Sequence, residues 1–185
     1  MLIFGLTLFH AWDHYMDVPH LGETLGEDGY DTFFTGKCHN HESALTRAYD
    51  TLGPCAVGGM FGSTEVGGAA YNRPCEGNTW SPSDTSLGGH WMTLPDGTIQ
   101  HSSERWTDAA VAFIHSEHAG APFFLHLAYN APHDPRQAPQ EFLDLYPEDD
   151  IKVPPNAWPE HPFDNGELGV RDELLTPFPR TSEAV

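Results

Sequence analysis

The sequence predicts an α/β fold in which a parallel sheet is flanked by helices. Two passages carry this prediction, because each contains a helical pattern, then an apolar run of strand length, then a polar motif. The 185 residues and the 39% apolar content are sufficient for one globular core. We therefore expect a single domain over residues 1–185.

The first passage joins a short helix to a strand. Leu21 and Leu25 are about one helical turn apart, and Gly29 is a typical residue to end a helix. Residues 30–35 (YDTFFT) are aromatic and β-branched and predict a strand that stops at Gly36. The polar motif Lys37-Cys38-His39 follows this strand.

The second passage repeats this order. A helix is expected from Ser102 or Ser103, either of which is a candidate N-cap, to about His118. Residues 123–128 (FFLHLA) predict a strand that is covered on both faces. It ends in a polar motif at residues 130–135 (NAPHDP).

The rest of the chain predicts few regular elements. Residues 56–97 are rich in glycine and predict an irregular insertion. A short helix is expected over residues 139–145. From about 147 to 181 the chain is acidic and rich in proline, which predicts a surface loop.

The charge of the chain excludes some partners. The formal net charge is −19, with 27 acidic residues against 8 basic ones. Nucleic acids and anionic membranes are bound through Lys and Arg, so neither is expected as a partner. The apolar start at residues 1–11 is too short to span a bilayer and does not resemble a secretory signal.

The cysteines do not form a metal-binding pattern. Cys38, Cys55 and Cys75 show no C-x-x-C spacing, and three cysteines allow at most one internal disulfide. Cys55 with Cys75 is the favoured pair. This cysteine usage does not indicate a cellular compartment.

Lys37, His39 and His133 are the candidate site residues. A lysine ammonium suits the oxygens of a sulfate or phosphate ester, and a histidine can accept or deliver a proton. Proline on both sides of the His133-Asp134 pair restricts the backbone that carries the imidazole. Each residue also has a simpler interpretation, as a solvated lysine or an ordinary loop histidine.

The predicted topology brings these residues to one place. Ligands of open parallel sheets bind at the carboxyl ends of the strands. Both polar motifs follow predicted strands, so we expect all three side chains at the same sheet edge.

Other polar groups have weaker claims to a site. Asp164-Asn165-Gly166 contains ligands that suit a hard cation, but Asn-Gly after prolines favours a turn. Asp149-Asp150 predicts a solvated acidic pair. His10 and His14 are four residues apart, without a convincing helix to hold them.

Together these motifs resemble the sulfatase family of the alkaline-phosphatase superfamily. Residues 29–40 (GYDTFFTGKCHN) are similar to the family signature G-Y-x-T-x-x-x-G-K-W-H, with Cys38 in place of tryptophan. Residues 122–146 are similar to the family's P-F-F…P-H-x-P segment and the helix beyond it. The stretch from Pro154 to Thr181 resembles a loop of many bacterial members.

The resemblance implies a fold and a reaction. The fold is a large mixed, mainly parallel sheet between helices, of which this chain is a part. The reaction is sulfate ester hydrolysis by a formylglycine hydrate beside calcium. By resemblance, Lys37 contacts the nucleophile and the sulfate, His39 draws a proton from the sulfated hydrate, and His133 binds the sulfate or assists the leaving alcohol.

The resemblance also indicates what this chain lacks. No cysteine here begins the C/S-x-P/A-x-R motif from which formylglycine is made, and no metal ligands are expected within the chain. We therefore expect residues 1–185 alone to be inactive. A phosphodiesterase or phosphonate hydrolase of the same superfamily and a non-catalytic anion-binding remnant are the alternatives. For the full-length enzyme the expected substrate is a small-molecule or sugar sulfate ester, and the expected location is periplasmic or extracellular.

Overall fold

The computed structural model describes residues 5–7, 14–57, 81–87, 89–133, 137–156 and 162–163. The chain divides into two compact units. The first unit consists of Met1–Gly62 and Ser102–Asn130, and the second of Ser63–His101 and Ala131–Val185.

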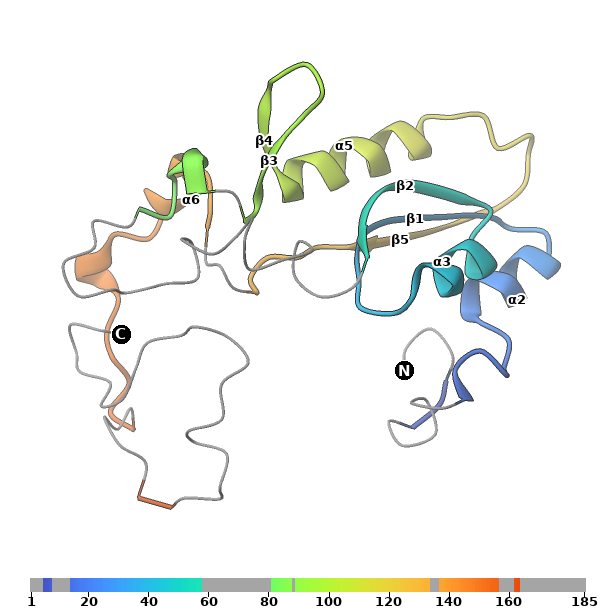
Figure 1. Cartoon of the computed structure of the whole chain (residues 1–185), viewed down its shortest axis with the longest axis horizontal. Helices are drawn as coiled ribbons and strands as arrows, with labels where there is room; N and C mark the ends of the chain where they lie inside the picture. The colour runs from blue at the N-terminus through green and yellow to red at the C-terminus, as the bar shows by residue number, and fades with distance from the viewer. Residues whose placement is uncertain are drawn as a thin grey trace. The chain divides into compact units, whose positions relative to one another are not determined.

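The first unit is built on three parallel strands, β1 (Asp31–Cys38), β2 (Thr51–Val57) and β5 (Phe123–Ala128). Their order is β2-β1-β5, and β1 pairs in parallel with both neighbours (Figure 1). The predicted parallel sheet is therefore confirmed. The strand predicted over residues 123–128 has the predicted bounds.

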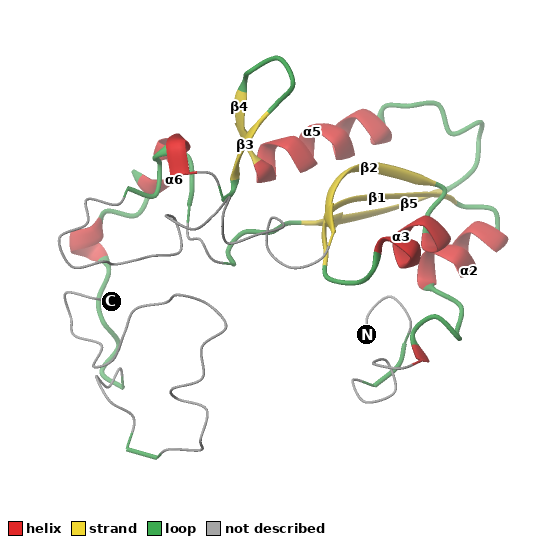
Figure 2. Cartoon of the chain, viewed as in Figure 1, coloured by secondary structure: helices red, strands yellow, loops and turns green. Residues whose placement is uncertain are grey.

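Helices cover both faces of this sheet. α2 (Leu21–Glu27) and α3 (Glu42–Ala48) lie on one side and α5 (Ser102–Ile114) on the other (Figure 2). Two nitrogens of Arg47 in α3 lie 2.9 and 3.1 Å from the carboxylate oxygens of Glu23 in α2. The hydrogen bond from Arg47 holds the pKa of Glu23 below its usual range.

Neighbouring residues of β1 pack against different helices. Phe34 is buried in one cluster with Leu45 and Ala48 of α3. Phe33 stacks on Phe113 of α5, with ring centroids 4.4 Å apart. Because side chains alternate along a strand, these contacts lie on opposite faces. The middle of β1 is therefore buried on both sides.

The ends of β1 and α5 differ from the prediction. β1 continues past Gly36 to Cys38. Ser102 and Ser103 both lie inside α5, so neither is its N-cap, and the helix ends at Ile114 rather than near His118. It ends there because the Ser116 backbone N–H turns to the Phe113 carbonyl at 3.0 Å, three residues back.

β5 is less covered than predicted. It is an edge strand among the described strands, its residues after Phe123 are half-buried, and Phe123 is 43% exposed. Both faces of β5 are still partly covered, since Phe123 packs against Phe113 of α5 and Phe124 stacks on Tyr49, which follows α3.

The second unit contains a hairpin that the sequence did not predict. β3 (Trp91–Thr93) pairs antiparallel with β4 (Ile99–His101), and Gly97 takes φ +86° in the connecting turn. Residues 91–93 of the insertion predicted over 56–97 thus form a strand, whereas residues 58–80 lie outside the described part, so the irregular insertion stays a prediction. The other elements are η1 (Thr85–Leu87), α6 (Gln140–Leu143) and η2 (Glu148–Asp150).

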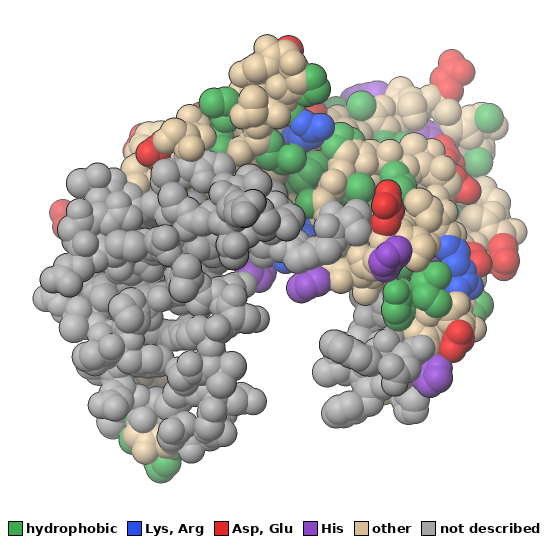
Figure 3. Space-filling model, viewed as in Figure 1, with side chains coloured by type: hydrophobic (Ala, Val, Ile, Leu, Met, Phe, Trp, Pro, Cys, Tyr) green, Lys and Arg blue, Asp and Glu red, His purple; other side chains and the backbone are tan. Residues whose placement is uncertain are grey.

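The later chain is exposed over much of its described part. α6 lies within the predicted helix 139–145, and residues 149–156 are all exposed. Acidic side chains are scattered over the face in Figure 3, with few basic ones among them. Across the described ranges, no helix is both long and apolar enough to cross a bilayer.

The burial of His126 in β5 makes the first unit sensitive to acid. Tyr49 Oη and Nδ1 of His126 share a hydrogen bond of 2.6 Å, and burial lowers the pKa of His126. The unfolded chain therefore takes up this proton first, from its ordinary pKa of about 6.5 downward. Stability should fall as pH drops below about 6.5, until the folded-state pKa is reached.

This pH dependence is measurable by urea unfolding between pH 8 and 5. His126→Gln keeps a polar side chain that does not titrate, so its stability should change less with pH than that of the wild type. Equal pH dependence in the two proteins would contradict the assignment to His126.

Candidate functional site

The carboxyl ends of β1 and β5 lie side by side. The two strands stay in register along their whole pairing, from Asp31 with Phe123 to Gly36 with Ala128. Lys37 follows Gly36 directly and is half-buried near the end of β1. The first polar motif therefore stands at the edge where ligands of parallel sheets bind.

Gly36 makes the close approach of β1 and β5 possible. Its φ is +117°, and a Cβ built on it would lie 1.9 Å from the backbone oxygen of Ala128. The pairing of β1 with β2 also shifts register between Phe34 and Gly36. A side chain at residue 36 would displace the strand end that carries Lys37.

The residues after Gly36 divide between surface and core. Cys38 is 3% exposed and packs in the same cluster as Phe34. By alternation Lys37 belongs to the opposite face, that of Phe33 and α5. His39 is exposed just beyond the strand. The tryptophan position of the family signature is thus a core position here, filled by a smaller side chain.

The described cysteines are not suited to be nucleophiles. Cys38 and Cys55 are free thiols, and burial raises the pKa of each. Nucleophilic attack needs the thiolate, which a raised pKa disfavours. Cys55 is free, so the favoured pairing with Cys75 is not formed, and Cys75 itself lies outside the described residues.

Asn130 is a polar residue at this edge that sequence reasoning did not single out. It follows β5 by two residues and is 3% exposed. Its Oδ1 accepts a hydrogen bond of 2.9 Å from Nε1 of Trp106, which is fully buried in α5. Its Nδ2 has no hydrogen-bond partner in the described structure.

Asn130 Nδ2 is therefore an unused donor beside the end of β5. A buried donor without a partner is costly, so such groups often mark the place of a missing ligand or water. The available sequence signal was its position directly after a strand, in the motif that also contains His133.

His133 lies in the second unit and is exposed. Its backbone carbonyl accepts a hydrogen bond of 3.0 Å from Nε2 of His90. Lys37 and His39 belong to the first unit, where they stand together at the end of β1. The convergence of all three side chains on one anion stays a prediction.

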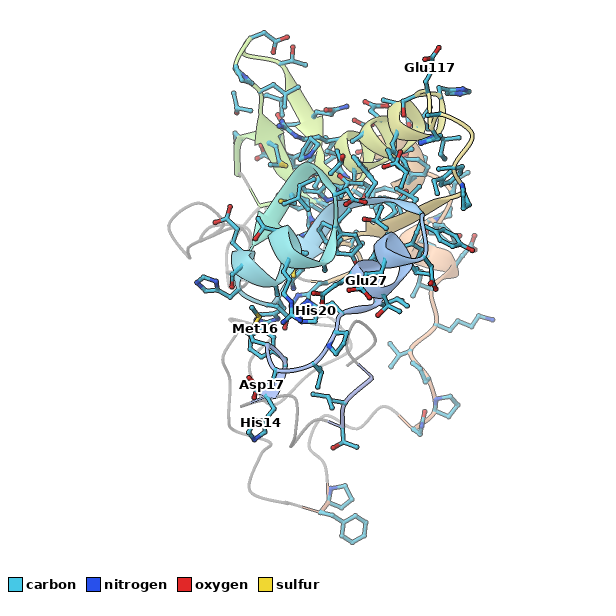
Figure 4. The ribbon with its side chains drawn as sticks, turned by 90° about the vertical axis from the view of Figure 1, so that its right-hand side faces the viewer. His14, Met16, Asp17, His20, Glu27 and Glu117 are labelled. Atoms are coloured by element: carbon cyan, nitrogen blue, oxygen red, sulfur yellow. The ribbon has the colours of Figure 1, made fainter. Side chains whose placement is uncertain are left out.

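Among the described residues, the other sequence candidates do not form a metal site. His14 pairs with Asp17 at 2.9 Å, away from the sheet (Figure 4). His20 is buried just before α2, and its Nε2 donates to the Tyr15 carbonyl at 2.8 Å. Asp149 and Asp150 are exposed in η2. His10 and Asp164-Asn165 lie outside the described residues.

The described side chains do not fit calcium or a formylglycine. No group of three or more His, Cys, Asp or Glu residues among them has the arrangement to hold a metal ion. Hard cations such as calcium take six to eight oxygen ligands. The two described thiols are packed in or beside the core instead of facing a site.

Comparison with known proteins gives one family. Residues 6–174 match the family model described as Sulfatase. Two similar solved structures are Ps i-CgsB, with 22% identity and a TM-score of 0.45, and Ps i-CgsB in complex with k-i-k-neocarrahexaose, with 21% identity and a TM-score of 0.44. Each match covers 74% of this chain, and the chain spans 31% of each matched structure.

Proposed function

Because the chain belongs to the sulfatase family, we propose that it forms part of a sulfuric ester hydrolase and supplies the anion-binding edge of its active site. Lys37, His39 and His133 are the proposed site residues. The proposed substrate class is a small-molecule or sugar sulfate ester.

One observation carries this proposal, which is the parallel pairing of β1 with β5. It places Lys37 next to the point where the chain leaves β5 toward Asn130 and His133. His133 follows Ala128 by only five residues, which reach roughly 18 Å at full extension. This covalent connection is compatible with the proposal that one sulfate group at this edge binds to both polar motifs.

The three side chains have different proposed tasks. The Lys37 ammonium would neutralise sulfate oxygens, which matters in a chain with a net charge of −19. His133 would donate a hydrogen bond to the ester oxygen that becomes the leaving alcohol. His39, exposed beyond β1, would serve as a proton acceptor. Asn130 Nδ2 offers a further donor at the same edge.

The nucleophile and the cation of the family are assigned to sequence outside residues 1–185. The family resemblance implies formylglycine and calcium, and the described residues fit neither. We propose that the chain binds and orients the sulfate ester, while turnover needs these other groups.

An assay with paired substrates tests the function. The complete enzyme should hydrolyse an aryl sulfate with added calcium, at a higher kcat/KM than a bis-aryl phosphate diester. Preference for the diester would replace the proposal with a phosphodiesterase. Sulfate binding without turnover would indicate an anion-binding remnant.

A second arm of the assay uses residues 1–185 alone. We expect no turnover of an aryl sulfate with added calcium, because no residue of the chain is a suitable formylglycine precursor. If aryl sulfate turnover co-purifies with this protein and its rate is proportional to the protein concentration, the assignment of the nucleophile to sequence outside residues 1–185 is contradicted.

A further inference from the structure

A buried polar cluster supports the segment that carries His133. The cluster consists of His90, His101 and Gln137, which are 0%, 3% and 3% exposed. All three lie in the second unit, as does His133. The two imidazoles stack with ring centroids 5.5 Å apart, and Trp91 packs edge-on against His101 at 5.0 Å.

Three hydrogen bonds link His90 and His101 to His133 and Gln137. His90 Nε2 lies 3.0 Å from the His133 carbonyl oxygen. The backbone N–H of His90 donates to Oε1 of Gln137 at 2.7 Å, and His101 Nε2 lies 3.2 Å from the Gln137 carbonyl oxygen. The bonds therefore attach to the two residues that flank positions 134–136.

These contacts fix the protonation of the two rings. A carbonyl oxygen only accepts hydrogen bonds, so Nε2 must carry the proton in both His90 and His101. A buried donor that reaches a loop carbonyl is costly to leave unpaired. Its pairing therefore restrains the backbone of His133 directly.

We propose that His90 is a positioning residue, which holds the His133 backbone so that its imidazole is aimed at the leaving-group oxygen of the substrate. This inference rests on the proposed function, because it presumes a task for His133. His90 is chosen because its Nε2 hydrogen-bonds to the backbone carbonyl of His133 itself. His101 Nε2 contacts the Gln137 carbonyl, at the far end of the segment.

The proposal predicts a selective kinetic effect. In the complete enzyme, His90→Leu removes the donor and should lower kcat about 10–100-fold for an alkyl sulfate, whose leaving group needs protonation. Small displacements of a catalytic group have effects of this size. For 4-nitrophenyl sulfate, whose leaving group is stable as an anion, kcat should change by less than about threefold.

Two variants serve as controls. His90→Gln retains an N–H donor near the position of Nε2 and should restore most of the alkyl sulfatase rate. His115→Leu replaces an exposed histidine next to α5 and should behave as the wild type. Equal rate losses for both esters in His90→Leu, or no rescue by Gln, would mean a purely structural role and overturn the proposal.

Hydrogen–deuterium exchange supplies a readout that does not require activity. Exchange in the peptide that contains residues 131–139 should rise about tenfold or more in His90→Leu, with little change in β1 and β5. Unchanged exchange in this peptide would overturn the proposal. A rise in exchange across the whole chain would also overturn it. If the wild type hydrolyses no sulfate ester, the proposed function fails, and the exchange result alone decides whether His90 holds the segment.

Discussion

Replacing Lys37 with alanine is expected to lower kcat/KM for an aryl sulfate about 10²–10³-fold in the complete enzyme. This is the usual loss when one group that stabilises developing negative charge is removed. The loss should be large here because basic residues are few and Lys37 stands half-buried at the end of β1, the edge where the anion is proposed to bind. Steady-state kinetics with 4-nitrophenyl sulfate measures it.

The chain contains its own control for this experiment. Lys152, the other lysine of the chain, is exposed after η2. Lys152→Ala removes the same charge and should leave kcat/KM within about twofold, since an exposed charge is screened by salt. Similar losses in both variants would show that net charge matters rather than a site at Lys37.

Replacing Gly36 with alanine is expected to have the largest effect on folding. Its φ of +117° is unfavourable for alanine, and the new Cβ would lie 1.9 Å from the Ala128 oxygen. Backbone atoms of a paired strand cannot move aside without breaking the β1–β5 pairing. We expect a loss of about 4 kcal/mol or more in the free energy of unfolding.

Gly29 separates the two causes of this loss. It has φ +88°, but a Cβ there would meet no atom within 4 Å. Gly29→Ala should therefore cost only the conformational penalty, about 1–2 kcal/mol. Urea unfolding of both variants gives the comparison, and equal losses would contradict the close approach of the two strands.

Much of the sheet was predictable because local pattern and burial agree there. Residues 123–128 are apolar, bounded by Pro122 and a polar motif, and form β5 with those bounds. Residues 30–35 predicted most of β1. The end of β1 was missed because glycine usually interrupts a strand, whereas Gly36 continues it through a conformation that only glycine takes easily.

β2 was missed because its sequence argues locally against a strand. It contains Gly53 and Pro54. Proline is tolerated at a sheet edge, and β2 is an edge strand among those described. Gly53 leaves room for the Phe33 ring, which would lie 2.6 Å from a Cβ there, and the Pro54 carbonyl accepts a 2.7 Å hydrogen bond from Thr35 Oγ1. These reasons are tertiary and cannot be read from periodicity.

The candidate site was predictable only in part for the same reason. Lys37, His39 and His133 stand in recognisable motifs after strands. Asn130 is of interest because it contacts Trp106, which lies 24 residues away in the sequence. His90 is of interest because it contacts the His133 carbonyl, 43 residues away. Such long-range pairings leave no local signature in a single sequence.

A crystal structure of the complete enzyme with inorganic sulfate tests the central claim most directly. We expect one sulfate ion beyond the ends of β1 and β5, with its oxygens within roughly 3 Å of both the Lys37 ammonium nitrogen and an imidazole nitrogen of His133. A structure in which these two side chains point to different faces of the molecule, or contact separate anions, would contradict it.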